Sequence, residues 1–302
     1  MKKFFKKVKR QMSGQLEAQV IQILRAIEAR VLGRMSVFEG ELKKLQNRLD
    51  AETGNAGSVK QKELYLDLMQ QALLGTLISA EKKDEATADL REVGHDWPET
   101  AFTMIGQARM RNLRTLLEEV VDNNVSGDFV ETGVWRGGAC IYAKAIFDSY
   151  GQSKRKVWVA DSFAGLPEPD EEKYPDDAGD LHHTHEALAI TKETVAENFK
   201  QFDLLDDNVK FLQGWFKDTL PDAPIKEISV LRLDGDMYES TMDALKALYD
   251  KVSDGGYIII DDYSLKPCAQ AVSDFCQSQN IDDKLIDIDG TAVYWQKNTA
   301  AN

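Results

Sequence analysis

Cysteine, proline and long apolar runs are all scarce in this chain of 302 residues, which has only three cysteines and seven prolines. Cys140, Cys268 and Cys276 do not have the spacing of a disulfide framework or a metal site, so we expect free thiols in a reducing, cytoplasmic compartment. The longest apolar runs, such as 257–260, are the length of a strand, whereas a transmembrane helix needs about 20 residues. Because no apolar stretch follows the basic N-terminus, we also expect no cleaved signal peptide.

Basic residues are scarce outside the N-terminal part of the chain. The formal net charge is −14, yet residues 1–50 hold twelve Lys and Arg against five Asp and Glu. An acidic body argues against a nucleic-acid partner, because the phosphate backbone selects positive surfaces. The basic segment is interpreted as a solvated tail, with contact to another protein or an anionic membrane surface as the alternative.

The first hundred residues have helical periodicity. Apolar residues recur at spacings of three and four through 14–50, which predicts a long helix of coiled-coil type, and a second helix is expected at 60–79. We therefore predict an N-terminal helical extension at 1–58, a helical entry or lid segment at 59–98 and a catalytic domain at 99–302. The extension favours a homo-oligomer, or docking to another protein or a membrane surface.

After Pro98 the chain alternates between helices and short apolar strands, which predicts an α/β domain with a mostly parallel sheet and helices on both faces. The last two strands, joined at Asp289-Gly290, predict a hairpin that adds an antiparallel strand. This order of seven strands resembles class I methyltransferases. The expected strands are 128–132, 156–161, 209–213, 228–234, 256–262, 285–289 and 292–295; the expected helices are 106–124, 139–150, 192–202, 240–251 and 266–279.

Glycines and acidic residues follow the first three strands, at the edge where open α/β sheets bind ligands. The first strand leads into Glu131-Thr-Gly133-Val-Trp-Arg-Gly137-Gly138, where glycines let the backbone approach a ligand and the carboxylate can attract an ammonium or sulfonium group. Asp161 can accept hydrogen bonds from ribose hydroxyls, and Gly214 and Trp215 can border an adenine. Together they indicate S-adenosyl-L-methionine (SAM) as cofactor.

Four carboxylates end the next two strands, namely Asp234, Asp236, Asp261 and Asp262. Such a group repels itself unless protons or a cation offset the charge. Three oxygen ligands with open positions suit Mg²⁺, and two of those positions could take the adjacent hydroxyls of a diol. The metal would lower the pKa of a hydroxyl while a carboxylate outside the ligand set takes the proton.

Six motifs in the sequence strongly resemble the macrocin O-methyltransferase (TylF/MycF/NovP-like) family, over roughly residues 64–297. They are Thr103-Met-Ile-Gly, Glu131-Thr-Gly-Val-Trp-Arg-Gly-Gly, Ala160-Asp-Ser-Phe-Ala-Gly-Leu-Pro, Gly214-Trp-Phe-Lys-Asp-Thr-Leu-Pro, Leu231-Arg-Leu-Asp-Gly-Asp-Met-Tyr-Glu-Ser-Thr and Ile260-Asp-Asp-Tyr.

The resemblance implies a role for each matching residue. It implies that Asp234, Asp261 and Asp262 hold the metal and that Asp236 is the general base. It implies a sugar or glycoside acceptor. The residues that it places at the cofactor are Glu131, Gly133, Asp161 and Ser162, with Thr103 and Met104 nearby on the entry segment.

The polar stretch 168–186 contains His182, His183 and His185. We interpret it as a lid over the acceptor, with one histidine touching the substrate, and zinc binding as the weaker alternative.

Two further functions stay open from the sequence. One is a SAM-binding scaffold without activity in a glycan or natural-product assembly complex. The other is a metal-dependent glycosyltransferase, which would not explain the first glycine-rich loop or the second aspartate pair.

Overall fold

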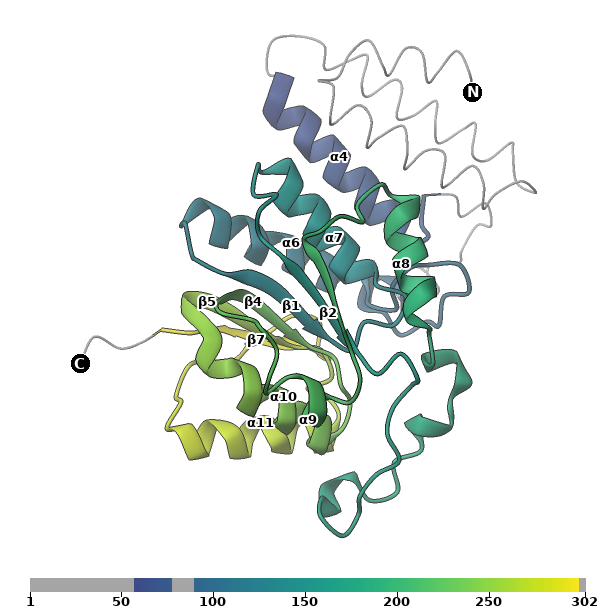
Figure 1. Cartoon of the computed structure of the whole chain (residues 1–302), viewed down its shortest axis with the longest axis vertical. Coiled ribbons are helices and arrows are strands. Elements are labelled where there is room, and N and C mark those ends of the chain that lie inside the picture. The colour runs from purple at the N-terminus through teal and green to yellow at the C-terminus, as the bar shows by residue number, and fades with distance from the viewer. Residues whose placement is uncertain (1–56, 78–89, 299–302) are drawn as a thin grey trace.

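The computed structural model describes residues 57–77 and 90–298. Its centre is a seven-stranded sheet in the order β3-β2-β1-β4-β5-β7-β6 (Figure 1). Only β7 runs antiparallel to its neighbours, which confirms the predicted fold class. The strands are β1 (Asp128–Thr132), β2 (Val157–Asp161), β3 (Val209–Gln213), β4 (Ile228–Leu233), β5 (Val252–Ile260), β6 (Ile286–Asp287) and β7 (Val293–Gln296).

Helices cover both faces of the sheet (Figure 1). On one face are α4 (Gly57–Leu73), α6 (Gln107–Asp122), α7 (Gly138–Ser149) and α8 (Lys192–Gln201); on the other are α9 (Phe216–Thr219), α10 (Tyr238–Leu248) and α11 (Lys266–Gln279). Each layer forms its own apolar core with the strands. Helix α7 is apolar nearly all round and is buried from its first residue to Phe147, as expected for a helix enclosed between the sheet and its neighbours.

Helix α4 belongs to the same hydrophobic core as the helices on its face of the sheet. Its apolar side chains, from Leu64 to Leu73, share one hydrophobic cluster with α6 and α7. Arg114 on α6 contacts the polar side of α4 through ion pairs of 3.0 Å to both Glu63 and Asp67. The helix ends earlier than the predicted 60–79, because the chain turns at Gly75 with a positive φ of 69°. The predicted helix at 14–50 lies outside the described residues.

The segment between β2 and α8, residues 162–191, projects beyond the carboxyl ends of the strands (Figure 1). It contains three single-turn helices: η1 (Pro175–Asp177), η2 (His182–Thr184) and η3 (Glu186–Leu188). Asp177 anchors it by accepting hydrogen bonds from the backbone N–H groups of Tyr238 and Glu239 at the start of α10, at 2.6 and 2.9 Å. A second anchor is the 2.9 Å bond from Trp135 Nε1 to the Ala187 carbonyl.

One further element is the short helix η4 (Tyr249–Lys251), which links α10 to β5. Among the helices of the described residues, none has both the length and the apolar character needed to cross a bilayer.

Candidate active site

A cleft opens at the carboxyl ends of the parallel strands. Residues following β1, β2, β3 and β4 all contribute to its wall, as the parallel topology requires. The predicted site residues that line it are Met104, Gly133, Asp161, Ser162, Gly214, Trp215, Asp234 and Asp236.

The loop between β1 and α7 brings its backbone against the next strand end. Gly133 has a φ of 84°, and a Cβ there would lie 1.7 Å from the Asp234 carbonyl oxygen, so only glycine fits. Gly137, with a φ of 83°, caps the start of α7 and lies outside the cleft wall. Thr103 is buried beside this loop, where a Cβ on Gly138 would meet it at 2.7 Å. The predicted loop and entry segment therefore do come together.

Asp161 organises the loops on both sides of it. Its Oδ2 accepts a 2.8 Å hydrogen bond from the Val134 N–H, and its Oδ1 accepts one of 2.7 Å from the Phe163 N–H. Burial raises the pKa of this carboxyl, although the backbone donors favour the charged form. Ser162 next to it donates to the Gly165 carbonyl at 2.6 Å. Both side chains thus shape the cleft wall as well as facing it.

Glu131 lies beneath the cleft and does not line it. The side chain is almost fully buried, and it accepts hydrogen bonds from Arg232 and from Cys140 Sγ, the latter at 2.7 Å. Burial raises the pKa of Glu131 to about 7, against the opposing effect of the Arg232 charge. Its predicted role at the cofactor stays a prediction; the contacts in hand make it a partner of the buried arginine.

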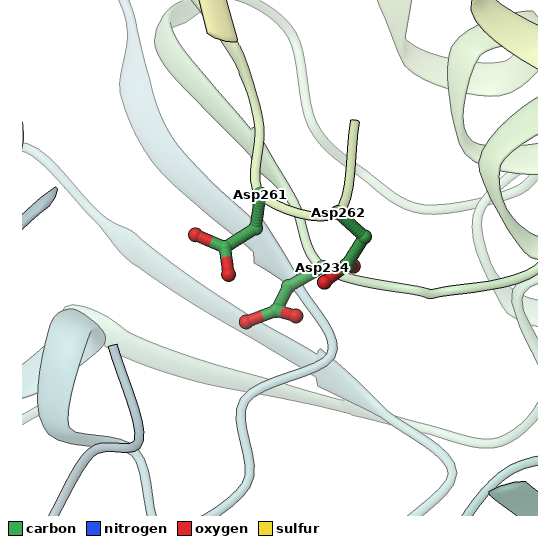
Figure 2. A group of neighbouring side chains, drawn as sticks. All are labelled: Asp234, Asp261 and Asp262. Atoms are coloured by element: carbon green, nitrogen blue, oxygen red, sulfur yellow. The ribbon is translucent and has the colours of Figure 1, made fainter. Parts of the chain in front are cut away.

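The three aspartates predicted as metal ligands do converge (Figure 2). Asp234, Asp261 and Asp262 each offer a carboxylate oxygen, and these atoms lie within 4.8 Å of one another. They come from the adjacent ends of β4 and β5, whose register pairs Leu233 with Ile260. The backbone N–H of Asp236 donates to Asp262 Oδ2 at 3.1 Å, which places the fourth carboxylate beside the group.

Two buried arginines form ion pairs with this group of aspartates. Arg232 donates to Asp261 Oδ1 and, at 2.8 Å, to Asp234 Oδ2. Arg109 donates to Asp261 Oδ2. Burial would raise the pKa of Asp261, but Arg109 and Arg232 outweigh it and lower that pKa. Asp261 therefore stays charged.

The other carboxyl groups are buried and lie close together, which disfavours their charged forms. Burial and then Asp236 raise the pKa of Asp262 well above its ordinary value. Burial and then Asp234 raise the pKa of Asp236 to about 7. Asp236 also has a φ of 58°, an unusual conformation for a residue other than glycine, of the kind found at functional sites. Four carboxylates against two arginines fit a divalent cation with oxygen ligands, such as Mg²⁺.

Comparison with known proteins identifies the family of this chain. The profile of the macrocin-O-methyltransferase (TylF) family matches residues 42–297, which is most of the chain and begins within the predicted extension 1–58. The chain belongs to this family. It is therefore a SAM-dependent O-methyltransferase, as the resemblance implied.

Individual members of the family are close in sequence and structure. A demethyldecarbamoylnovobiocin O-methyltransferase from Streptomyces niveus is 49% identical over 78% of this chain and 93% of its own length. An 8-demethyl-8-(2,3-dimethoxy-alpha-L-rhamnosyl)-tetracenomycin-C 4'-O-methyltransferase from Streptomyces olivaceus is 46% identical over 80% of this chain and 95% of its own. The solved structure of the O-methyltransferase NovP is 50% identical, with a TM-score of 0.75, over 78% of this chain and 99% of that one.

The six motifs include Arg232 but not Arg109, and the resemblance assigns a role to neither. Arg232 sits inside an otherwise apolar strand, and Arg109 lies on the buried face of α6 together with Leu113 and Leu116. An ionisable residue at a position that should be apolar predicts a buried ion pair. That signal was present in the sequence. The sequence does not indicate the partners of the two arginines, because Arg109 and Asp261 are 152 residues apart along the chain.

The histidine-rich segment is a loop, as the sequence indicates. His182 is held by Asp180, with Nδ1 and Oδ2 2.7 Å apart, and its ring centroid is 6.1 Å from that of His185. Burial would lower the pKa of His182, but Asp180 and the nearby charge of Asp236 raise it. Within the described residues, the aspartate trio is the only group of three or more side chains arranged to hold a metal ion, so the zinc alternative has no support.

Proposed function

We propose that this TylF-family chain methylates one hydroxyl of a vicinal diol on the sugar of a glycoside, glycan or natural product. In this proposal Asp234, Asp261 and Asp262 hold Mg²⁺, and Asp236 is the general base. The cofactor contacts in this proposal come from the remaining predicted residues of the cleft wall, namely Met104, Gly133, Asp161, Ser162, Gly214 and Trp215.

One observation carries the proposal: two of the four carboxylates, Asp234 and Asp236, share a single cleft with the glycine-rich loop. Asp234 and Asp236 line the same wall as Gly133 and Asp161. A methyl donor at the loop and a hydroxyl at the carboxylates would therefore lie within one cleft, as an in-line transfer requires. The sugar as acceptor is supported by the Streptomyces olivaceus relative, whose name specifies a rhamnosyl substrate.

Each side chain has a distinct part in the transfer. A bound Mg²⁺ would supply Lewis acidity that lowers the pKa of the acceptor hydroxyl. Asp236, which faces the cleft, accepts the proton as the methyl group moves to the hydroxyl oxygen. The loop 162–191, anchored on α10 and on Trp135, limits the access of water from the open side.

The test combines binding and turnover. We expect calorimetry to show binding of S-adenosylhomocysteine (SAH), the product form of the cofactor, and labelled SAM to transfer methyl groups to members of a glycoside panel in Mg²⁺ but not in EDTA. Asp236→Asn should lower turnover by about 10²- to 10⁴-fold, the usual effect of losing a general base, while SAH affinity is retained. Asp243→Asn, another aspartate of the cleft wall, is the matched control and should lower turnover far less.

The two alternatives considered from the sequence, which membership of the TylF family argues against, would give different results in the same experiment. A glycosyltransferase would not bind SAH. A SAM-binding scaffold would bind SAH without methylating any glycoside, and Asp236→Asn would then have no activity to remove. Turnover that persists fully in EDTA would contradict the metal part of the proposal.

A further inference from the structure

Arg109 joins three separate parts of the molecule through one guanidinium group. Its Nη1 donates to Asp261 Oδ2 at the proposed metal site. Its Nε donates to Asp289 Oδ2 at 2.8 Å, in the turn between β6 and β7. Its Nη2 donates to the Val93 carbonyl at 2.9 Å. All three nitrogens are therefore engaged, and the side chain is only 8% exposed.

The Val93 contact leads to the cofactor cleft. Val93 belongs to residues 90–106, here called the entry strap. Arg91 donates to the carbonyls of both Met104 and Ile105, the second at 2.6 Å. A Cβ on Gly94 would lie 2.4 Å from the Gly106 nitrogen, so the two ends of the strap pack backbone against backbone. Val93 thus cannot shift independently of Met104, which lines the cleft.

We infer that Arg109 couples the divalent-metal site to the cofactor cleft, so that metal and cofactor each favour binding of the other. This inference rests on the proposed function. The continuous path runs from Asp261 through Arg109 and Val93 to Met104. A cation that restricts the motion of Asp261 also restricts the guanidinium group and hence the strap. A cofactor in contact with Met104 then loses less conformational entropy of the strap when it binds. By linkage, the cofactor favours the metal to the same extent.

The rigid fork of arginine is essential to this role. A lysine at 109 would keep the positive charge beside Asp261, but its single ammonium cannot bridge three acceptors in fixed directions. Arg109→Lys therefore breaks the coupling while it keeps one positive charge among these buried carboxylates. Arg91→Lys breaks the path at the strap, without touching any metal-site carboxylate.

The experiment measures the dissociation constant of SAH by calorimetry, once in EDTA and once in saturating MgCl₂. For the wild-type protein we expect Mg²⁺ to tighten SAH binding by about 5-fold or more, within the usual range of coupling between sites. Arg109→Lys and Arg91→Lys should bring the ratio of the two constants close to one. Arg114→Lys is the matched control: Arg114 lies on the same helix and bonds Glu63, Asp67 and Glu118 away from the cleft, so its ratio should stay at the wild-type value.

Each possible outcome is informative. The coupling would be overturned if the ratio of the two dissociation constants were the same in the wild type, Arg109→Lys and Arg91→Lys. A wild-type ratio of one would also overturn it. A protein that binds neither SAH nor Mg²⁺ contradicts the proposed function itself, whereas one that binds both independently contradicts only the coupling. Circular dichroism checks folding, and if Arg109→Lys is unfolded, Arg91→Lys decides the result.

Discussion

Glu131 shows how burial changes the chemistry of a single carboxyl group. Its pKa rises from 4.5 to about 7, chiefly through burial. Between these values the folded protein holds a proton that the unfolded chain has already lost, so Glu131 lowers the free energy of unfolding as the pH rises, by roughly 3 kcal/mol. Glu131→Gln should make the total decline shallower, measured as thermal midpoints between pH 5 and pH 8. The exposed control Glu63→Gln should keep it; an unchanged slope in Glu131→Gln would refute the assignment.

Residues at strand ends were the most predictable part of the site. Asp234, Asp261 and Asp262 follow two buried strands, and the carboxyl ends of neighbouring parallel strands meet at one edge, so their convergence follows from the pattern. The contacts of Glu131 could not be predicted from the strand pattern. Its position before a glycine-rich loop suggested the cofactor, but the direction of its side chain depends on Arg232, a partner 101 residues away.

At the scale of elements, the loop 162–191 depends on one helix end. Asp177 is 1% exposed and accepts the N–H groups of Tyr238 and Glu239, so it caps α10 from a distant segment. Asp177→Ala should lose about 1 kcal/mol of stability, the usual contribution of a cap. It should also release the loop, and with it Asp180 and His182 beside Asp236. We therefore expect a higher KM for the acceptor and faster limited proteolysis within the loop.

The neighbouring Asp176 supplies the control for this change, because it is exposed and Asp176→Ala should leave both measurements unchanged. Equal proteolysis rates in the two variants would contradict the anchoring role of Asp177. The sequence could not choose between these aspartates. The segment has no helical or strand period, so its course over α10 depends on tertiary packing alone, whereas the predicted helices and strands after Pro98 agree with the observed bounds within a few residues.

For the whole molecule, the site concentrates negative charge in an already acidic chain of net charge −14. A cation that binds the aspartates of the folded protein but not the unfolded chain stabilises it by about 2.7 kcal/mol at a hundredfold excess over its Kd. We expect MgCl₂ to raise the thermal midpoint above that in EDTA. Asp262→Asn should reduce this shift, because it removes one of the proposed ligand oxygens. A shift equal to that of the wild type would argue against Asp262 as a ligand.

The hydrogen bond between Cys140 and Glu131 has a consequence for thiol chemistry. Cys140 is fully buried under the glycine-rich loop, and burial followed by Glu131 raises the pKa of its thiol well above the ordinary value. Alkylating reagents attack the thiolate, so this cysteine reacts only in molecules whose loop has opened. Cys276, which is partly exposed, reacts without such opening. The ratio of the two labelling rates therefore reports how often the floor of the cofactor cleft opens in the native protein.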